Sequence, residues 1–380
     1  MRVGINGLHL TRGGGGAVRY ATELLRAICQ TRPDVRLTVF VSRDVPPELR
    51  EAPWADAVRW VQLPVHAHGR TATAAQLGAL APVAAAHRVR VLHSLAGVGP
   101  PRLPSVLASV VTLLDVIWLL VPDQVTMSAA QRASWERTTR LATRTATRVI
   151  AISHAAATDI ARAYGIDPAR IDVTPLGVRA ELPAVATPAP ELRARFGLGD
   201  GRLLLSVGQY QPYKAQDQLI RAVAQLEHRD VVLALAGPPT AFGDELAELA
   251  AQLGIADRVR LLGFVGDDDL EGLYAAADAV VQPSRIEGFG LPALEALQRG
   301  RPLACSDRSA LGEVVGDAAL RFDPDDIDAI ATAVGRLLDD PRLRSDLELR
   351  GPRRAAGFSW ETTAAATLES YERALTRRPR

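Results

Sequence analysis

Short runs of β-branched and apolar residues alternate along the chain with longer segments whose apolar residues recur at helical spacing. Residues 2–7 (RVGING) are the first such run, and residues 17–29 (AVRYATELLRAIC) form the first helical pattern. Strands that alternate with helices build parallel sheets that are covered on both faces. The pattern therefore predicts an α/β protein whose further strands lie at residues 35–42, 88–94, 109–115, 148–153, 170–177, 202–208, 231–237, 258–264, 278–284 and 302–306.

A proline-rich stretch at residues 180–201 divides this pattern into two halves. Pro183, Pro188 and Pro190 make the stretch a stiff connection at the surface. A length of 380 residues also favours two domains over one. We expect two doubly wound, Rossmann-like domains, residues 1–183 and 184–359, that face each other across a cleft. Ligands of such sheets bind beyond the carboxyl ends of the strands.

Bulk composition excludes several classes of protein. The net charge of +1 does not indicate a nucleic-acid partner, and Cys29 and Cys305 have no metal or redox spacing, which fits a reducing cytoplasm. The amino terminus lacks the apolar core of a signal peptide. The longest apolar run, residues 103–122, carries Asp115 near its centre and ends at Pro122, so we interpret it as a buried strand and a loop.

The strongest chemical signal is residues 282–300, QPSRIEGFGLPALEALQRG. Pro292 opens a helix after a glycine-containing loop, and the N–H groups near Gly290 and Leu291 can then face an anion. Glu287 and Glu295 lie on either side of this helix start. Two carboxylates would repel a bare phosphate, but they suit a ligand that carries hydroxyl groups on both sides of its phosphates. A nucleotide sugar has this layout.

These residues resemble the signature of glycosyltransferase family 4, which comprises retaining enzymes with the GT-B fold. The resemblance continues, in the family's order, through residues 151–178, 206–226, 257–284 and 357–371. It implies that helix 360–380 packs back on the first domain. It also implies a nucleotide diphosphate sugar as donor, with Glu287 on the sugar hydroxyls and Glu295 on the ribose. The further donor contacts that it implies in this loop are Gly288, Phe289, Gly290 and Leu291.

Lys214 is the only lysine among 44 basic residues. Lysine is a compact point charge, whereas arginine is a planar fork, and a tight phosphate pocket distinguishes the two. The family resemblance implies a basic pair that contacts the donor diphosphate. Lys214 falls on the second position of this pair, and Gln209 replaces the usual arginine at the first. We therefore predict that Lys214 and Glu287 are catalytic.

In the first domain, Gly13, Gly14, Gly15 and Gly16 follow the first strand and permit close approach of a ligand. The resemblance assigns this loop to the diphosphate and the acceptor. Leu114, followed by Asp115, stands where relatives have a histidine near the 6-hydroxyl of the donor sugar, which leads to the hypothesis of a 6-deoxyhexose donor. His93 also ends a strand on this side, as a pocket residue or as a structural histidine.

The resemblance implies a retaining hexosyltransferase that needs no metal or other cofactor, and the composition predicts that it works in the cytoplasm. Its partners would be a nucleotide-sugar donor and a small-molecule, polysaccharide or lipid-linked acceptor. A nucleotide-sugar epimerase and a catalytically weakened binding homologue stay open as alternatives. Asp268 and Glu271 fit a helix capping box better than a metal site. A row of arginines would allow peripheral membrane contact but favours a solvated helix face; it comprises Arg137, Arg140, Arg144 and Arg148.

Overall fold

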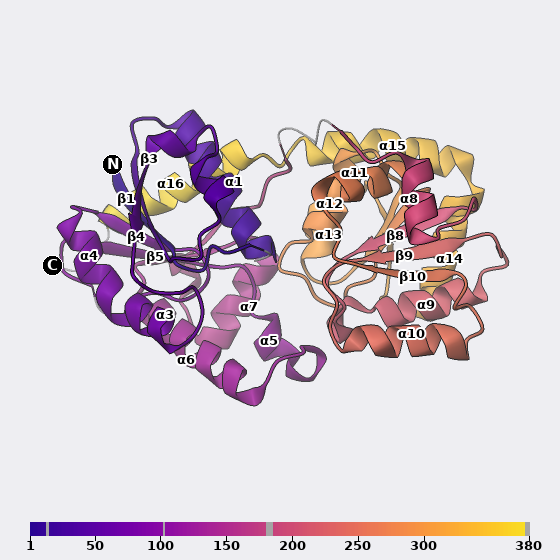
Figure 1. Ribbon diagram of the computed structural model, residues 1–380, viewed down its shortest axis with the longest axis horizontal. Coiled ribbons are helices and arrows are strands. Elements are labelled where there is room, and N and C mark those ends of the chain that lie inside the picture. Colours follow the sequence, from indigo (N-terminus) through magenta and orange to yellow (C-terminus); the bar gives the residue numbers. More distant parts are fainter. Residues whose placement is uncertain (13–14, 102, 180–184, 377–380) are drawn as a thin grey trace. The chain divides into compact units, whose positions relative to one another are not determined.

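The computed structural model describes residues 1–12, 15–101, 103–179 and 185–376, and these divide into two compact units (Figure 1). We call Met1–Leu119, Met127–Gly177 and Ser359–Arg380 the first unit. Leu120–Thr126 and Val178–Phe358 form the second unit. The predicted boundary at 183/184 lies outside the described residues. The assignment of Leu120–Thr126 to the second unit was not predicted, and a hydrogen bond from Thr126 N to the Gln211 side chain accounts for it (2.8 Å).

The first unit is built on a seven-stranded parallel sheet in the order β3-β2-β1-β4-β5-β6-β7. Successive strand residues point to opposite faces, and β4 shows that helices cover both. Leu92 packs with Leu80 and Ala84 of α4, whereas His93 bonds to Tyr371 of α16. The elements are β1 (Arg2–Gly7), α1 (Gly15–Thr31), β2 (Arg36–Val41), α2 (Pro47–Arg50), β3 (Val58–Gln62), α3 (Arg70–Ala74), α4 (Leu80–Ala86), β4 (Val91–Ser94), β5 (Ala108–Leu113), α5 (Ile117–Leu120), α6 (Ala129–Thr145), β6 (Arg148–Ala151), α7 (His154–Tyr164), β7 (Ile171–Val173) and α16 (Trp360–Thr376).

The second unit holds a six-stranded parallel sheet in the order β10-β9-β8-β11-β12-β13. Apolar residues of β8 and β9 pack against α9 and α14 in one core cluster. The elements are α8 (Ala189–Phe196), β8 (Leu203–Val207), α9 (Gln216–Gln225), β9 (Val232–Ala236), α10 (Phe242–Gln252), β10 (Val259–Gly263), α11 (Asp267–Ala276), β11 (Ala279–Gln282), α12 (Leu291–Gln298), β12 (Leu303–Ser306), α13 (Ala310–Val315), β13 (Leu320–Phe322), α14 (Ile327–Asp339) and α15 (Pro341–Ala355).

All the strands predicted from the hydrophobic pattern are present, and the two parallel-sheet α/β units confirm the predicted fold class. The prediction missed β3 and β13, which are edge strands and less completely buried. Part of the predicted loop after Asp115 is the short helix α5. No helix among the described residues is long and apolar enough to cross a membrane.

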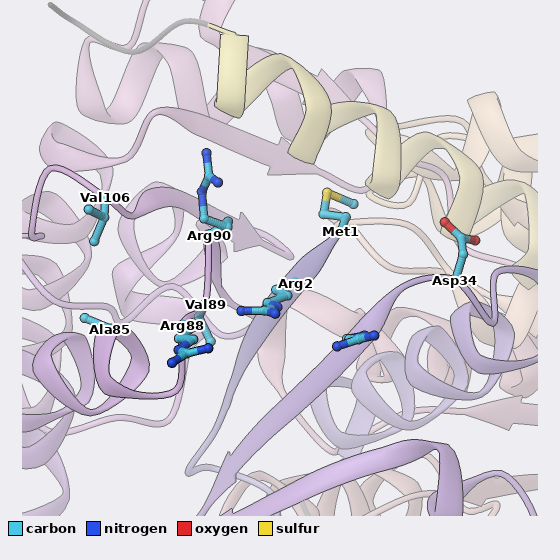
Figure 2. A pocket seen from close by; sticks show the side chains of 9 residues that line it. Met1, Arg2, Asp34, Ala85, Arg88, Val89, Arg90 and Val106 are labelled. Atoms are coloured by element: carbon cyan, nitrogen blue, oxygen red, sulfur yellow. The ribbon is translucent and has the colours of Figure 1, made fainter.

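A cavity of about 590 Å³ opens at the amino ends of the first sheet (Figure 2). Arg2 and Arg36 start β1 and β2, and Arg90 immediately precedes β4, so the cavity lies at the edge opposite to the carboxyl ends of the strands. Ligands of open α/β sheets bind at the carboxyl ends, and none of the described predicted site residues lines this cavity.

Candidate active site

In the second unit, β8 and β11 pair with each other at the point where the strand order reverses. The chain continues from β8 to β9 on one side of this pair, and from β11 to β12 on the other side. Lys214 follows β8 in a short 3₁₀ turn, and Glu287 follows β11 in the loop before α12. Their side chains form an ion pair, with Nζ and Oε1 2.7 Å apart. The side chains are only 14% and 11% exposed. Two residues that the sequence singled out separately are therefore one charge pair at the switch point of the sheet.

Two serines hold Glu287 in place through three hydrogen bonds. The Ser284 hydroxyl donates to Oε1 (2.7 Å), the Ser309 hydroxyl donates to the backbone carbonyl of Glu287 (2.8 Å), and Ser309 Oγ accepts from the Glu287 N–H (3.2 Å). Sequence reasoning named neither serine. Ser284 lies in the quoted motif, three residues before Glu287, so its spacing could have indicated it.

The loop that carries Lys214 is tied to the loop that carries Glu287. Arg285 donates from its backbone to the carbonyl of Tyr213 (2.8 Å) and from its guanidinium to the carbonyl of Pro212 (2.8 Å). Ala215, directly after Lys214, adopts a left-handed conformation with φ 52° that is unfavourable for alanine. These contacts fix the position of Lys214 before any ligand binds. Neither Arg285 nor Ala215 was identified from the sequence.

Helix α12 begins as the motif predicts. Gly290 precedes the helix with φ 99°, and a Cβ there would lie 2.6 Å from a Leu311 methyl carbon, so both conformation and space require glycine. Pro292 occupies the first turn, where its missing N–H costs nothing. The ring of Phe289 is buried edge-on against Phe358 at 5.8 Å, so Phe289 offers a ligand only its backbone.

Glu295 lies inside α12 and is only 4% exposed. Its Oε2 accepts a hydrogen bond from the Tyr274 hydroxyl (3.0 Å), and Arg299 stacks over the Tyr274 ring at 4.6 Å. Arg299 in turn bonds to Glu271 (Nε–Oε2 2.9 Å). Tyr274 on α11 was missed because nothing in its local sequence marks it.

The predicted capping box at Asp268 and Glu271 is wrong. Gly266 is the residue before α11, no side chain caps the helix, and Glu271 pairs with Arg299. Among the described residues, no group of three or more His, Cys, Asp or Glu side chains could hold a metal ion.

Gln209, at the position where relatives have arginine, is exposed after β8. The neighbouring Tyr210 is buried and donates from its hydroxyl to the carbonyl of Leu235 (2.8 Å), which anchors the start of this loop. Lys214 is the cation that the structure places beside Glu287.

In the first unit, the structure brings Leu114 and Asp115 together in a pocket of about 470 Å³. The pocket lies beyond the carboxyl ends of β1, β4 and β5, and α5 and α6 supply Trp118 and Trp135 to its wall. Gly13 and Gly14 lie outside the described residues, whereas Gly15 and Gly16 begin α1. Asn6, at the end of β1, donates to the carbonyl of Val98 on the pocket wall (3.0 Å).

The structure does not place His93 in this pocket. His93 is fully buried, its Nδ1 lies 2.7 Å from the Tyr371 hydroxyl, and its Nε2 lies 2.7 Å from Thr112 Oγ1. The Tyr20 hydroxyl bonds to the same threonine (3.1 Å). Burial lowers the pKa of His93 to about 3. His93 is therefore a structural histidine, which was the alternative interpretation of its position.

The predicted row of four helical arginines is wrong at its last member. Helix α6 ends at Thr145, and Arg148 is a buried residue of β6 that pairs with Asp172 (Nε–Oδ2 2.8 Å). Arg140 is engaged by Glu136 on its own helix. The remaining arginines are those of an ordinary solvated helix face.

Two models of known protein families match most of the chain. The family described as "Glycosyl transferases group 1" matches residues 189–354, and the "Glycosyl transferase 4-like domain" matches residues 15–177. A D-inositol 3-phosphate glycosyltransferase of Frankia alni is 42% identical over 225 residues, which cover 56% of this chain and 55% of that protein. An MMP alpha-(1->4)-mannosyltransferase of Mycolicibacterium hassiacum is 36% identical over 234 residues, covering 60% and 54%. The chain thus spans about half the length of these curated relatives.

Solved structures match the chain over almost its whole length. Sucrose-phosphate synthase of Thermosynechococcus elongatus has a TM-score of 0.75 at 22% identity, with 99% of each chain covered. HepE of Anabaena, solved in complex with UDP and glucose, has a TM-score of 0.73 at 21% identity and covers 98% and 99%. At such identities these likenesses show the GT-B fold alone. The two family matches together cover most of the chain, and the chain belongs to glycosyltransferase family 4.

Proposed function

We propose that the protein is a retaining glycosyltransferase, which transfers a hexose from a nucleoside diphosphate sugar to a hydroxyl group of an acceptor. The observation that carries this proposal is the Lys214–Glu287 ion pair at the switch point of the second sheet, beside the start of α12. It lies within the region that matches "Glycosyl transferases group 1". HepE, which has the same fold, has been solved with UDP-glucose, and this supports a nucleotide-sugar donor.

The ion pair reduces the repulsion between the carboxylates of the site and the donor diphosphate. A lysine ammonium has three donors, so Lys214 is able to hold Glu287 and a phosphate oxygen at the same time. Its positive charge offsets the carboxylate that would otherwise repel the diphosphate. Glu287, held by Ser284 and Ser309, then accepts hydrogen bonds from the hydroxyl groups of the sugar. We assign the ribose hydroxyls to Glu295, which Tyr274 orients.

In the transfer step, the acceptor oxygen bonds to the anomeric carbon as the bond from that carbon to the diphosphate oxygen breaks. The acceptor proton passes to the leaving diphosphate, so the protein supplies position and charge stabilisation. Lys214 and the N–H groups at the start of α12 neutralise the charge that develops on the leaving group. In this scheme the reaction needs no metal. The cytoplasmic location stays a prediction.

The test is to incubate the full chain with a panel of nucleoside diphosphate sugars without acceptor, and to follow release of the free nucleotide and sugar. An active transferase releases both slowly, with the sugar first formed in the donor's anomeric configuration by NMR. The Lys214→Ala variant should bind nucleoside diphosphate more weakly in a thermal-shift assay. An altered sugar still attached to its nucleotide would instead establish the epimerase. No hydrolysis with any donor, despite nucleotide binding, would favour the catalytically weakened homologue.

A further inference from the structure

Four exposed arginines line the cavity at the amino ends of the first sheet (Figure 2). They are Arg2, Arg36, Arg88 and Arg90. Among the described lining residues, Asp34 alone is acidic. Both of its carboxylate oxygens accept hydrogen bonds from Arg32, which is not part of the lining (2.8 and 3.0 Å). The wall of the cavity therefore carries an excess of positive charge.

The sequence supplies no acidic side chain that would neutralise this excess. Among the described residues, no aspartate or glutamate forms an ion pair with any of the four guanidinium groups. The other residues of the first unit are 13–14, 102 and 377–380, and their sequence contains arginines but neither aspartate nor glutamate. The positive charge of the cavity is thus a property of the first unit.

Three of the arginines lie beside one another across neighbouring strands. Arg2 of β1 and Arg36 of β2 are register partners, so their side chains leave the same face of the sheet. Arg90, immediately before β4, donates its backbone N–H to the carbonyl of Arg2 (3.0 Å). Like charges directly opposite each other destabilise a sheet. An anion between these side chains would remove the repulsion.

Arg88 reaches the cavity through a backbone conformation that arginine rarely adopts. Its φ is 57°, in the left-handed region that favours glycine. The C-cap of α4 is His87, so Arg88 occupies the next position, where helices most often have glycine. Strained backbone of this kind is typical of ligand-binding positions. The fold thus accepts an unfavourable backbone at the residue that adds the fourth guanidinium to the cavity.

We propose that this cavity binds an anion with two or more negative charges on phosphate, which the four arginines hold. Guanidinium groups form short, bidentate, charge-assisted hydrogen bonds with phosphate oxygens. The volume of about 590 Å³ is within the range of about 300–1,000 Å³ that is typical of small-molecule sites. Lys214 and Glu287 belong to the second unit, so this is a second anion site with a ligand of its own.

Urea unfolding followed by tryptophan fluorescence detects binding to the first unit, because all five tryptophans lie there. The probe is inorganic tripolyphosphate, with sodium chloride at the same ionic strength as the reference. A ligand of the folded unit raises the urea midpoint, and its Kd follows from the dependence on ligand concentration. We expect this rise in the full chain, and an equal rise in Lys214→Ala. A rise that requires Lys214 would contradict a separate site.

Variants locate the binding. Glycine suits the left-handed backbone at position 88, so Arg88→Gly should fold as the wild type does. It should nevertheless bind tripolyphosphate about tenfold more weakly. Asp34→Asn removes the negative charge of the lining and should bind about threefold more tightly. Arg43→Gln is the matched control, an exposed arginine just beyond the carboxyl end of β2, and should leave the Kd unchanged. Equal Kd values in the wild type and Arg88→Gly, or equal losses in Arg88→Gly and Arg43→Gln, would refute the site.

Vesicles distinguish a lipid headgroup from a free phosphorylated compound. Cosedimentation uses phosphatidylcholine vesicles with and without phosphatidic acid, whose headgroup is a phosphomonoester. Binding that requires phosphatidic acid and is lost in Arg88→Gly would identify a membrane as the source of the phosphate. Stabilisation by tripolyphosphate without vesicle binding would identify a free compound. A wild type that is neither stabilised by tripolyphosphate nor bound to phosphatidic acid vesicles would overturn the proposal.

Discussion

Replacing His93 with glutamine should make the stability of the first unit less dependent on pH. His93 is completely buried between Tyr371 of α16 and Thr112 of β5, and Tyr20 of α1 faces it through the same threonine. Burial raises the pKa of both tyrosines, so every group around the imidazole is neutral. The folded protein therefore resists protonation of His93.

The sign and size of the effect follow from the two pKa values. The pKa of His93 is about 3 in the folded protein, and that of a histidine in the unfolded chain is 6.5. Between these values the unfolded chain binds a proton that the folded chain does not, so stability falls as the pH falls below 6.5. At pH 5 this amounts to about 2 kcal/mol, at about 1.4 kcal/mol per pH unit. His9 adds a similar loss, but it is present in both proteins and cancels in the comparison.

The assay is urea unfolding at pH 7.5, 6.5, 5.5 and 5.0, followed by tryptophan fluorescence. All five tryptophans lie in the first unit, so the signal reports that unit. The wild type should lose about 2 kcal/mol more than His93→Gln between pH 7.5 and pH 5. His228→Gln, in the second unit, should behave as the wild type. An identical pH dependence in wild type and His93→Gln would refute the assignment of His93 as a neutral, buried residue.

Four further predictions concern the candidate site. Lys214→Ala should lower kcat/KM for transfer about 100-fold or more, and Lys214→Arg should restore little of this activity. Steady-state kinetics with the identified donor would measure the loss, and full activity in the alanine variant would contradict the prediction. Dialysis against a chelator should leave the activity unchanged, whereas loss that Mg²⁺ or Mn²⁺ restores would reveal a metal site. Wild type should prefer a 6-deoxy donor to its 6-hydroxy counterpart about 30-fold, and Leu114→His should reverse or abolish this preference; a wild type that prefers the hydroxy sugar would refute it. Tyr274→Phe should reduce stability by about 1–3 kcal/mol, because buried Glu295 loses its hydroxyl partner; chemical denaturation followed by far-UV circular dichroism provides the measurement, and unchanged stability would argue against the bond.

The hydrophobic pattern by itself determined the α/β class and most of the strands. Interior strands of a parallel sheet are buried on both faces, so their sequences are nearly continuous apolar runs. Such a run is recognisable without knowledge of the strand order. The start of α12 was also predictable from local sequence, because Gly290 and Pro292 each adopt a conformation that the helix start requires. Lys214 and Glu287 stood out through residue rarity and motif, without any knowledge of their contact.

Contacts between residues that are distant in sequence were decided only by the tertiary structure. Lys214 and Glu287 are 73 positions apart in sequence. They pair because β8 and β11 are neighbours in the sheet, although β9 and β10 lie between them in sequence. The Ser309 hydroxyl bonds to Glu287 from the loop after β12. Neither pairing leaves a periodic signal, since each depends on strand order and not on local propensity.

Burial of polar side chains was the other property that the sequence could not determine. His93 lies near the carboxyl end of β4, where ligands of such sheets bind. Whether it faced a pocket or a helix depended on Tyr371, which is 278 residues away. Arg148 continued a helical spacing, yet the chain had already entered β6, where Asp172 neutralises it. A local pattern specifies which residues share a face. Only the packed structure specifies what covers that face, because the covering element comes from elsewhere in the chain.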